Sequence, residues 1–116
     1  MHALVIEDDP IIAMFIEDEL RDLGYRSVDT VSSEDEAIAA VAKVSPDLIT
    51  SDGCLASGSG ASAVRRIREM ISAPVIFITG DPERARQTLP GATVIEKPFS
   101  ISQLVAAVKA VRPNYG

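Results

Sequence analysis

The sequence predicts an α/β domain with a doubly wound, parallel sheet of five strands. Five short apolar runs alternate with five helical patterns along the 116 residues, and such alternation requires parallel strands joined by right-handed crossovers. Continuous apolar runs such as Leu4–Ile6 and Val75–Ile78 are typical of strands covered by helices on both faces. With no internal repeat or linker, the length predicts one domain over residues 1–116.

The expected strands are short, rich in apolar and β-branched residues, and bounded by turn-forming or charged residues. Each is followed by a segment whose apolar residues recur at helical spacing. In chain order the strands are Ala3–Ile6, Ser27–Val31, Asp47–Ser51, Val75–Thr79 and Thr93–Glu96.

The helices have recognisable starts. Asp9 is the expected N-cap of the first, with Pro10 in its first turn. The second and the last begin with capping-box patterns, Ser33 to Glu36 and Ser100 to Gln103. The fourth is expected to be short, because Pro90-Gly91 stops it. The apolar positions expected to face the sheet are Ile12, Ile16, Leu20, Leu23, Ala37, Val41, Val44, Val64, Ile67, Ile71, Ile101, Leu104, Val108 and Val111.

The composition excludes several classes of function. A net charge of −6 argues against direct binding of nucleic acid through a basic face. No apolar stretch approaches the roughly 18 residues that a membrane span needs, and the chain opens on a strand rather than a signal peptide. A single cysteine, Cys54, excludes an internal disulfide. We therefore expect a cytoplasmic protein without nucleic-acid or membrane partners. The basic group Arg65-Arg66-Arg68 is expected to be a solvated helix face, and His2 to have no role.

Polar residues that could carry chemistry follow the ends of four expected strands. Glu7-Asp8-Asp9 follows the first strand, Asp52 the third, Thr79 closes the fourth and Lys97 follows the fifth. Carboxylates about 5 Å apart repel by roughly 3 kcal/mol per pair at an effective dielectric of about 20, which points to a bound divalent cation such as Mg²⁺. A hydroxyl and an ammonium beside it would hold phosphoryl oxygens. Asp9 is assigned to the helix cap and left out of the metal site.

These residues carry a resemblance that covers the whole chain. In their order and approximate spacing they are similar to a response-regulator receiver domain, the phospho-accepting part of two-component (phosphorelay) signalling. The resemblance implies a flavodoxin-like sheet of order 2-1-3-4-5. The short fourth helix and the segment Thr79–Arg84 resemble receivers of alphaproteobacterial stress signalling. The matching segments are Ile6–Pro10, Pro46–Asp52, Pro74–Gly80 and Glu96–Phe99.

The resemblance also implies a role for each residue. Asp52 would become an aspartyl phosphate, Thr79 would bond the phosphoryl oxygens, and Lys97 would pair with them or with Asp52. The Lys97–Pro98 bond would be cis. The implied Mg²⁺ ligands are Glu7, Asp8, Asp52 and the backbone carbonyl of Cys54.

Two departures from the family pattern bear on function. Val94 stands where receivers usually carry a tyrosine or phenylalanine that moves together with the threonine, so Thr79 and Val94 form an altered switch. Ala56 stands where many receivers carry proline, and with Gly58 and Gly60 the loop after Asp52 is expected to be mobile.

The implied partners are a histidine kinase or histidine phosphotransferase upstream and an unknown downstream protein, with a homodimer left open. The only catalysis expected is the chain's own aspartyl phosphorylation and dephosphorylation. We expect either a stand-alone receiver or a piece of a larger regulator, contacting its target through the fourth helix, fifth strand and fifth helix. Two alternatives remain: a pseudo-receiver that signals without phosphate, and a haloacid-dehalogenase-like phosphatase.

Overall fold

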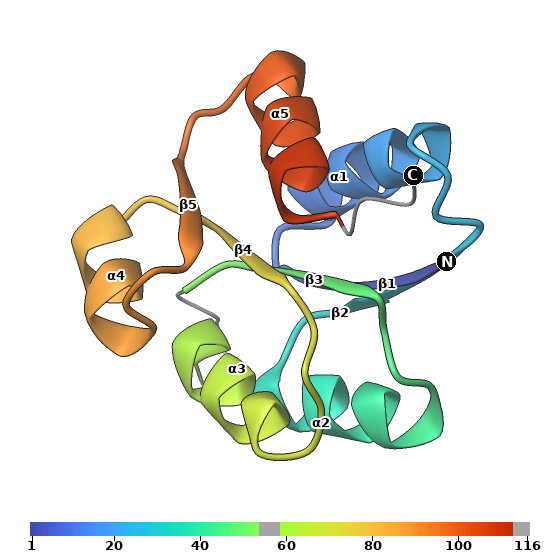
Figure 1. Cartoon of the computed structure of the whole chain (residues 1–116), viewed down its shortest axis with the longest axis vertical. Coiled ribbons are helices and arrows are strands. Elements are labelled where there is room, and N and C mark those ends of the chain that lie inside the picture. Colours follow the sequence, from blue (N-terminus) through green and yellow to red (C-terminus); the bar gives the residue numbers. More distant parts are fainter. Residues whose placement is uncertain (54–58, 113–116) are drawn as a thin grey trace.

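The computed structural model describes residues 1–53 and 59–112. In these residues strands and helices alternate strictly, and the helices lie on both faces of one central sheet (Figure 1). The strands are β1 His2–Ile6, β2 Ser27–Val31, β3 Leu48–Ser51, β4 Val75–Thr79 and β5 Thr93–Glu96. The helices are α1 Pro10–Asp22, α2 Glu34–Lys43, α3 Gly60–Arg68, α4 Pro82–Thr88 and α5 Ile101–Val111.

The sheet is entirely parallel and has the order β2-β1-β3-β4-β5, which confirms the predicted flavodoxin-like topology. From β1 the chain moves outward to β2 and then returns past β1 to β3. A crevice at the carboxyl ends of the strands is expected where the winding changes direction in this way. Because Ile6 pairs with Ser51 in the register of β1 and β3, the residues that follow these two strands emerge next to each other.

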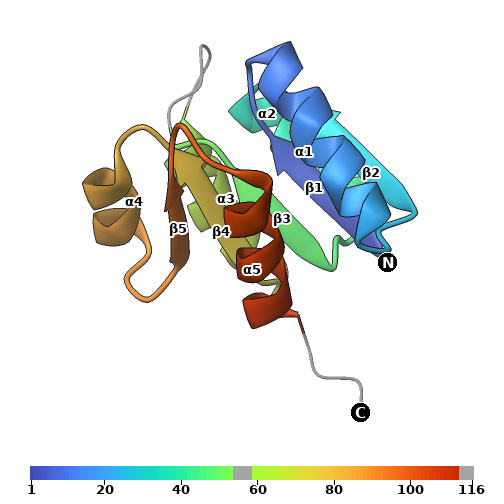
Figure 2. The ribbon, with the colours of Figure 1, turned by 90° about the horizontal axis from the view of Figure 1, so that it is seen from above.

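Alternating side chains of the strands form two cores. Ala3 and Val5 of β1 belong to the core under α1 and α5, whereas Leu4 and Ile6 belong to the core under α2, α3 and α4. Figure 2 shows the pairing of α1 with α5 on one face of the sheet. Both cores consist mainly of almost fully buried aliphatic side chains, with one buried aromatic residue in each, Tyr25 and Phe77. The strands are continuous apolar runs because each face of the sheet is covered. The two cores fix the sheet rigidly beneath its carboxyl edge.

The helix starts largely follow the predictions. The carboxylate of Asp9 accepts from the backbone N–H groups of Ile11 at 2.9 Å and Ile12 at 3.3 Å, which is the predicted cap. The capping box of Ser100 and Gln103 is complete. At α2 only half of the predicted box is present. Ser33 accepts from the backbone N–H of Glu36, but the carboxylate of Glu36 accepts from the hydroxyls of Ser32 and Ser33 at 3.0 Å.

Two apolar positions that were predicted to face the sheet, Val44 and Ile101, are exposed instead. Val44 is 48% exposed because α2 ends at Lys43 and Val44 already has an extended backbone, two residues before Pro46, a residue type before which helices usually end. Ile71 lies beyond the end of α3 but still packs, half-buried, against the core under α2, α3 and α4. Ile101 opens α5 and is 46% exposed.

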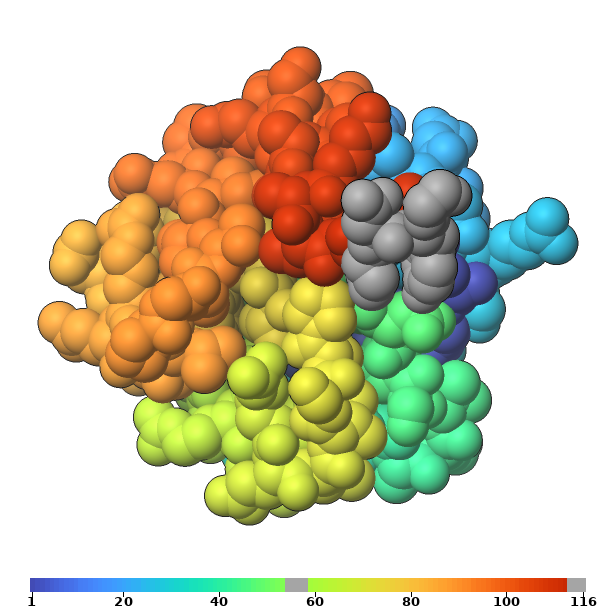
Figure 3. Space-filling model, in the orientation of Figure 1, coloured from blue at the N-terminus to red at the C-terminus, as the bar shows by residue number. Residues whose placement is uncertain are grey.

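The outer surface reflects the winding of the helices. In the space-filling view of Figure 3, the segments follow one another around the face shown, from blue through green, yellow-green and orange to red. Among the described residues, no helix combines the length and the apolar character that a membrane crossing requires.

His2, for which the sequence indicated no role, joins β1 to β2 through 2.8 and 3.2 Å contacts with Ser27 and Asp29.

Candidate functional site

Three carboxylates converge at the carboxyl edge of the sheet. Glu7 and Asp8 follow β1, Asp52 follows β3, and one oxygen from each lies within 4.8 Å of the others. Glu7 and Asp52 are buried, with 3% and 9% of each residue exposed, and Asp8 is half-buried. The register of β1 and β3 explains the meeting of residues that are far apart in the sequence. Asp9, which was left out of the metal site, caps α1 instead.

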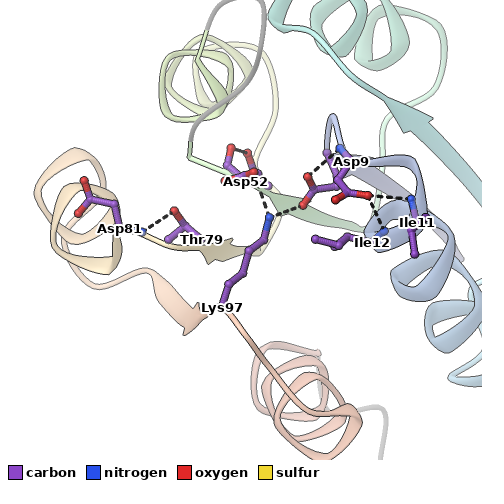
Figure 4. Close-up of polar contacts among 9 residues, drawn as sticks. Asp9, Ile11, Ile12, Asp52, Thr79, Asp81 and Lys97 are labelled. Carbon is purple, nitrogen blue, oxygen red and sulfur yellow. Dashed lines mark hydrogen bonds and ion pairs between the residues drawn. The ribbon is translucent and has the colours of Figure 1, made fainter.

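Lys97 supplies a positive charge to this cluster. Its Nζ lies 2.8 Å from Oε1 of Glu7 and 3.1 Å from Oδ2 of Asp52, and Figure 4 shows the side chain extending from the segment after β5 toward Asp52. The backbone N–H of Lys97 donates to the carbonyl of Thr79 at 2.9 Å, and the Lys97–Pro98 bond is cis. The contact with Asp52 follows the resemblance; the shorter contact with Glu7 was not predicted.

Burial and pairing shift two pKa values in the cluster. Burial raises the pKa of Glu7, and the hydrogen bond from Lys97 offsets this only in part. Burial by itself lowers the pKa of Lys97, but its hydrogen bonds to Glu7 and Asp52 outweigh that effect and raise it. The Lys97 side chain is therefore protonated at neutral pH. Its contribution to stability is present below its ordinary pKa and is lost as the pH rises through the raised value.

Glu7→Gln is expected to increase the free energy of unfolding at pH 7 in the absence of divalent cations. Because the pKa of Glu7 is higher in the folded state than its ordinary 4.5, the folded protein binds more protons between these two values, and its stability falls as the pH rises through that window. Glutamine keeps an acceptor for Lys97 but has no such pH dependence. Urea unfolding from pH 4 to 8 in EDTA, with the exposed Glu69→Gln as control, checks this. Parallel pH profiles for wild type and Glu7→Gln would contradict it.

Thr79 stands on the other side of Asp52. Its side chain is 2% exposed, and its hydroxyl oxygen accepts from the backbone N–H of Asp81 at 3.0 Å (Figure 4). A hydroxyl has one donor and two acceptor sites, so this contact leaves the proton as a donor. A Cβ added to Gly53 would lie 3.4 Å from the Thr79 hydroxyl oxygen, and one added to Gly80 would meet nothing within 4 Å. Gly53 therefore lies close to the Thr79 hydroxyl, whereas the position next to Gly80 is open.

Val94 is part of the core rather than of the crevice. It pairs in register with Phe77 and lies half-buried against the core under α2, α3 and α4. Its role in a switch with Thr79 stays a prediction. The remaining predicted ligand, Cys54, lies outside the described residues, as do Ala56 and Gly58.

Gly60 has a structural role at the site that no sequence pattern predicts. It was expected to make a loop mobile, but it is the first residue of α3 and is buried. A Cβ on Gly60 would lie 1.6 Å from the carbonyl oxygen of Asp52 and 2.7 Å from the hydroxyl of Ser51. The helix and the Asp52 backbone thus approach so closely that only glycine fits. A glycine between a serine and an alanine in the sequence does not reveal such a contact.

The donor set fits a hard cation. Three carboxylate oxygens from two neighbouring strand ends are the ligand chemistry that Mg²⁺ prefers, and Lys97 balances only one of the three negative charges. Thr79 at the end of β4 adds a hydroxyl, and Lys97 just after β5 adds an ammonium, at the same edge of the sheet. This combination suits positioning and charge neutralisation of a phosphoryl group.

Comparisons with known proteins agree with this geometry. A family model described as the response regulator receiver domain matches residues 3–109. The chain is 36% identical over 109 residues to the phyllosphere-induced regulator PhyR of Methylorubrum extorquens, covering 90% of this chain and 41% of PhyR. The solution structure of the receiver domain of Erythrobacter litoralis PhyR has 34% identity and a TM-score of 0.87, covering 99% and 95% of the two chains. A structure of the PhyR stress response regulator has 37% identity and a TM-score of 0.80, covering 95% and 44%.

The chain spans between 41% and 50% of the curated relatives that it matches first, so the similarity concerns their receiver portion. The similarity to PhyR confirms the resemblance to stress-signalling receivers that the segment Thr79–Arg84 and the short α4 indicated. With the family model matching nearly the whole sequence, the chain belongs to the response-regulator receiver domain family.

Proposed function

We propose that this receiver accepts a phosphoryl group on Asp52 from the phosphohistidine of a kinase or phosphotransferase, with Mg²⁺ bound by Glu7, Asp8 and Asp52. The observation that carries the proposal is the convergence of these three carboxylates within 4.8 Å. Lys97, just after β5, contacts Glu7 and Asp52, and Thr79 at the end of β4 lies next to Gly53 and the backbone of Lys97. A crowded acidic crevice has no benefit for folding, so its arrangement favours a function in binding.

In the proposed reaction a carboxylate oxygen of Asp52 attacks phosphorus and forms the new O–P bond. The N–P bond of the donor breaks, and its electron pair stays on the imidazole nitrogen. Lys97, 3.1 Å from Asp52, and the proton of the Thr79 hydroxyl bind phosphoryl oxygens after transfer. Mg²⁺ supplies charge neutralisation between the carboxylate and the phosphoryl group. Asp52 reacts once per phosphorylation and hydrolysis cycle, so the chain acts on itself rather than on a separate substrate.

The output is proposed to be contact with a downstream protein through α4, β5 and α5, in the cytoplasm and without nucleic acid or membrane. Val94 lacks a ring that could change position, so another element must transmit the state of Thr79. Asp81 connects Thr79 to α4. Its backbone N–H donates to the Thr79 hydroxyl, and its carboxylate caps α4 by accepting from the Arg84 N–H at 3.2 Å. A shift of Thr79 toward a phosphoryl group therefore reaches the first turn of α4 directly.

Phosphorylation is accordingly expected to order residues 80–90, the segment that contains α4. A phosphoryl group that holds the Thr79 hydroxyl also holds Asp81 and the helix cap that Asp81 provides. NMR relaxation-dispersion measurements with and without a phosphoryl mimic on Asp52 check this, with α1 as internal reference. Unchanged exchange over residues 80–90 would exclude the mechanism.

Asp52→Asn tests the proposed function. We expect it to abolish labelling by acetyl phosphate and to raise the free energy of unfolding in EDTA by about 1 kcal/mol, because it removes repulsion from two carboxylates at the cost of one contact with Lys97. Mg²⁺ at 100 times its dissociation constant should stabilise the wild type by about 2.7 kcal/mol and the variant far less. Calorimetry and labelling assays measure these effects, with the exposed Asp18→Asn as control.

Undiminished labelling of Asp52→Asn would show that the acceptor is another residue.

The pseudo-receiver alternative, which signals without phosphate, makes a different prediction for binding of the downstream protein. It requires that Asp52→Asn bind the downstream protein as the wild type does, with or without a phosphodonor. Membership of the receiver family leaves no support for the phosphatase alternative.

A further inference from the structure

We propose that Glu34, the first residue of α2, is a positioning residue that holds the backbone of Asp52 and Gly53 in place through the N-terminus of α3. This inference rests on the proposed function of Asp52. Glu34 lies outside the acidic crevice and has no counterpart among the residues that the family resemblance assigned to the site. Its connection to Asp52 consists of contacts between α2, α3 and the backbone after β3.

Glu34 binds the start of α3 at several points. Its Oε1 accepts from the backbone N–H of Ser59 at 3.3 Å, and its Oε2 accepts from the hydroxyl of Ser62 at 3.0 Å and from Nη1 of Arg66 at 2.7 Å. The Glu34 side chain is 17% exposed, whereas that of its neighbour Asp35 is 98% exposed. The hydrogen bond from Arg66, followed by those from Ser59 and Ser62, lowers the pKa of Glu34, so the acceptor stays ionised at neutral pH.

Ser59 extends this connection to the phosphorylation site. As the N-cap of α3 it accepts from the Ser62 N–H at 3.2 Å, and its hydroxyl donates to the carbonyl of Gly53 at 3.4 Å. Gly60, the next residue, lies against the carbonyl of Asp52, where a Cβ would come within 1.6 Å. The position of the α3 N-terminus thus sets the position of the Asp52–Gly53 backbone.

The backbone after Asp52 needs such support. The ladder of β3 ends at Ser51, and the Asp52 N–H still donates to the Ile6 carbonyl at 2.9 Å. Beyond this bond, Gly53 lies between Ser59 on one side and the Thr79 hydroxyl on the other. Displacement of a reacting group by about 1 Å costs on the order of 100-fold in rate, so a loosened α3 N-terminus would slow phosphoryl transfer. The basic group on α3 is exposed, as the sequence predicts, and two of its members also make contacts: Arg66 binds Glu34 of α2, and Arg68 donates to the Ala73 carbonyl.

The test compares variants that separate positioning from stability. Glu34→Ala removes every contact, Glu34→Gln keeps an acceptor oxygen, and Arg66→Gln removes the ion pair but leaves the bonds to Ser59 and Ser62. Asp35→Ala is the exposed control. The initial rate of acetyl phosphate labelling at saturating Mg²⁺, per folded molecule, is expected to fall about tenfold in Glu34→Ala and to recover to within about threefold of wild type in Glu34→Gln. Arg66→Gln and Asp35→Ala should stay within about twofold of it.

If the Glu34–Arg66 ion pair contributed only to the stability of the fold, a different pattern would be expected. In that case Glu34→Ala and Arg66→Gln would lose melting temperature to a similar extent and label at the same rate, which would overturn the proposal. A second measurement does not require phosphorylation. The amide resonances of Gly53 and Asp52 should shift in Glu34→Ala and not in Arg66→Gln. If the wild type fails to label, the proposed function is wrong, and these resonances still decide whether Glu34 positions the backbone: unchanged shifts in Glu34→Ala refute it.

Discussion

Gly60→Ala is expected to lower the free energy of unfolding by about 3 kcal/mol, at the upper end of what overpacking of a filled interior costs. The added methyl would lie 1.6 Å from the Asp52 carbonyl oxygen and 2.8 Å from its carbonyl carbon. These neighbours are backbone atoms, so they cannot turn away as a flexible side chain would. The higher helix propensity of alanine, worth about 1 kcal/mol, is too small to compensate. Urea unfolding measures the loss.

The same substitution should also reduce phosphoryl acceptance, because relief of the clash requires α3 or Asp52 to move. Gly80→Ala is the matched control for stability: a Cβ there meets nothing within 4 Å, and we expect a change below about 0.5 kcal/mol. Equal urea midpoints for Gly60→Ala and Gly80→Ala would show that the α3 N-terminus is not held against Asp52.

Lys97→Met is expected to destabilise the protein by about 2 kcal/mol in EDTA. Removing one partner of a buried ion pair leaves an uncompensated charge and costs about 3–5 kcal/mol; we expect less here because the Lys97 side chain is 20% exposed. The two carboxylates that it contacts, those of Glu7 and Asp52, are almost fully buried, and methionine offers them no positive charge. Chemical unfolding in EDTA gives this difference directly.

Mg²⁺ should restore much of the stability lost in Lys97→Met, because a cation among the carboxylates replaces the missing charge. The exposed Lys109→Met on α5 serves as control and should respond little in either condition. A loss of stability in Lys97→Met that persists undiminished in saturating Mg²⁺ would mean that Lys97 supports the fold by packing rather than by its charge.

Much of the fold followed from local patterns. Strict alternation of apolar runs and helical periodicity leaves few topologies for a parallel sheet, and the order of the strand ends placed Glu7, Asp8, Asp52, Thr79 and Lys97 on one edge. In the structure the three carboxylates converge and Lys97 contacts two of them, while Thr79 accepts a backbone hydrogen bond from Lys97. Parallel sheets make such a prediction feasible because all their carboxyl ends lie on the same side.

The parts that sequence reasoning missed depend on contacts between distant segments. The bond from Ser59 to Glu34 joins residues 25 positions apart, and no periodicity encodes which helix ends meet. The close approach of Gly60 to Asp52 likewise arises only when α3 docks on the sheet. Helix ends were missed for a local reason, since Val44 fits the apolar stripe but lies past the end of α2.

The contacts of Lys97 have a consequence for the chain before it folds. The two carboxylates that Lys97 holds are 90 and 45 positions away from it, so an unfolded chain has no preassembled pocket for a cation. The free energy of the proposed Mg²⁺ binding would then be added in full to the native state. The resistance of this receiver to unfolding should therefore follow the free magnesium of its surroundings, even in a molecule that never meets a phosphodonor.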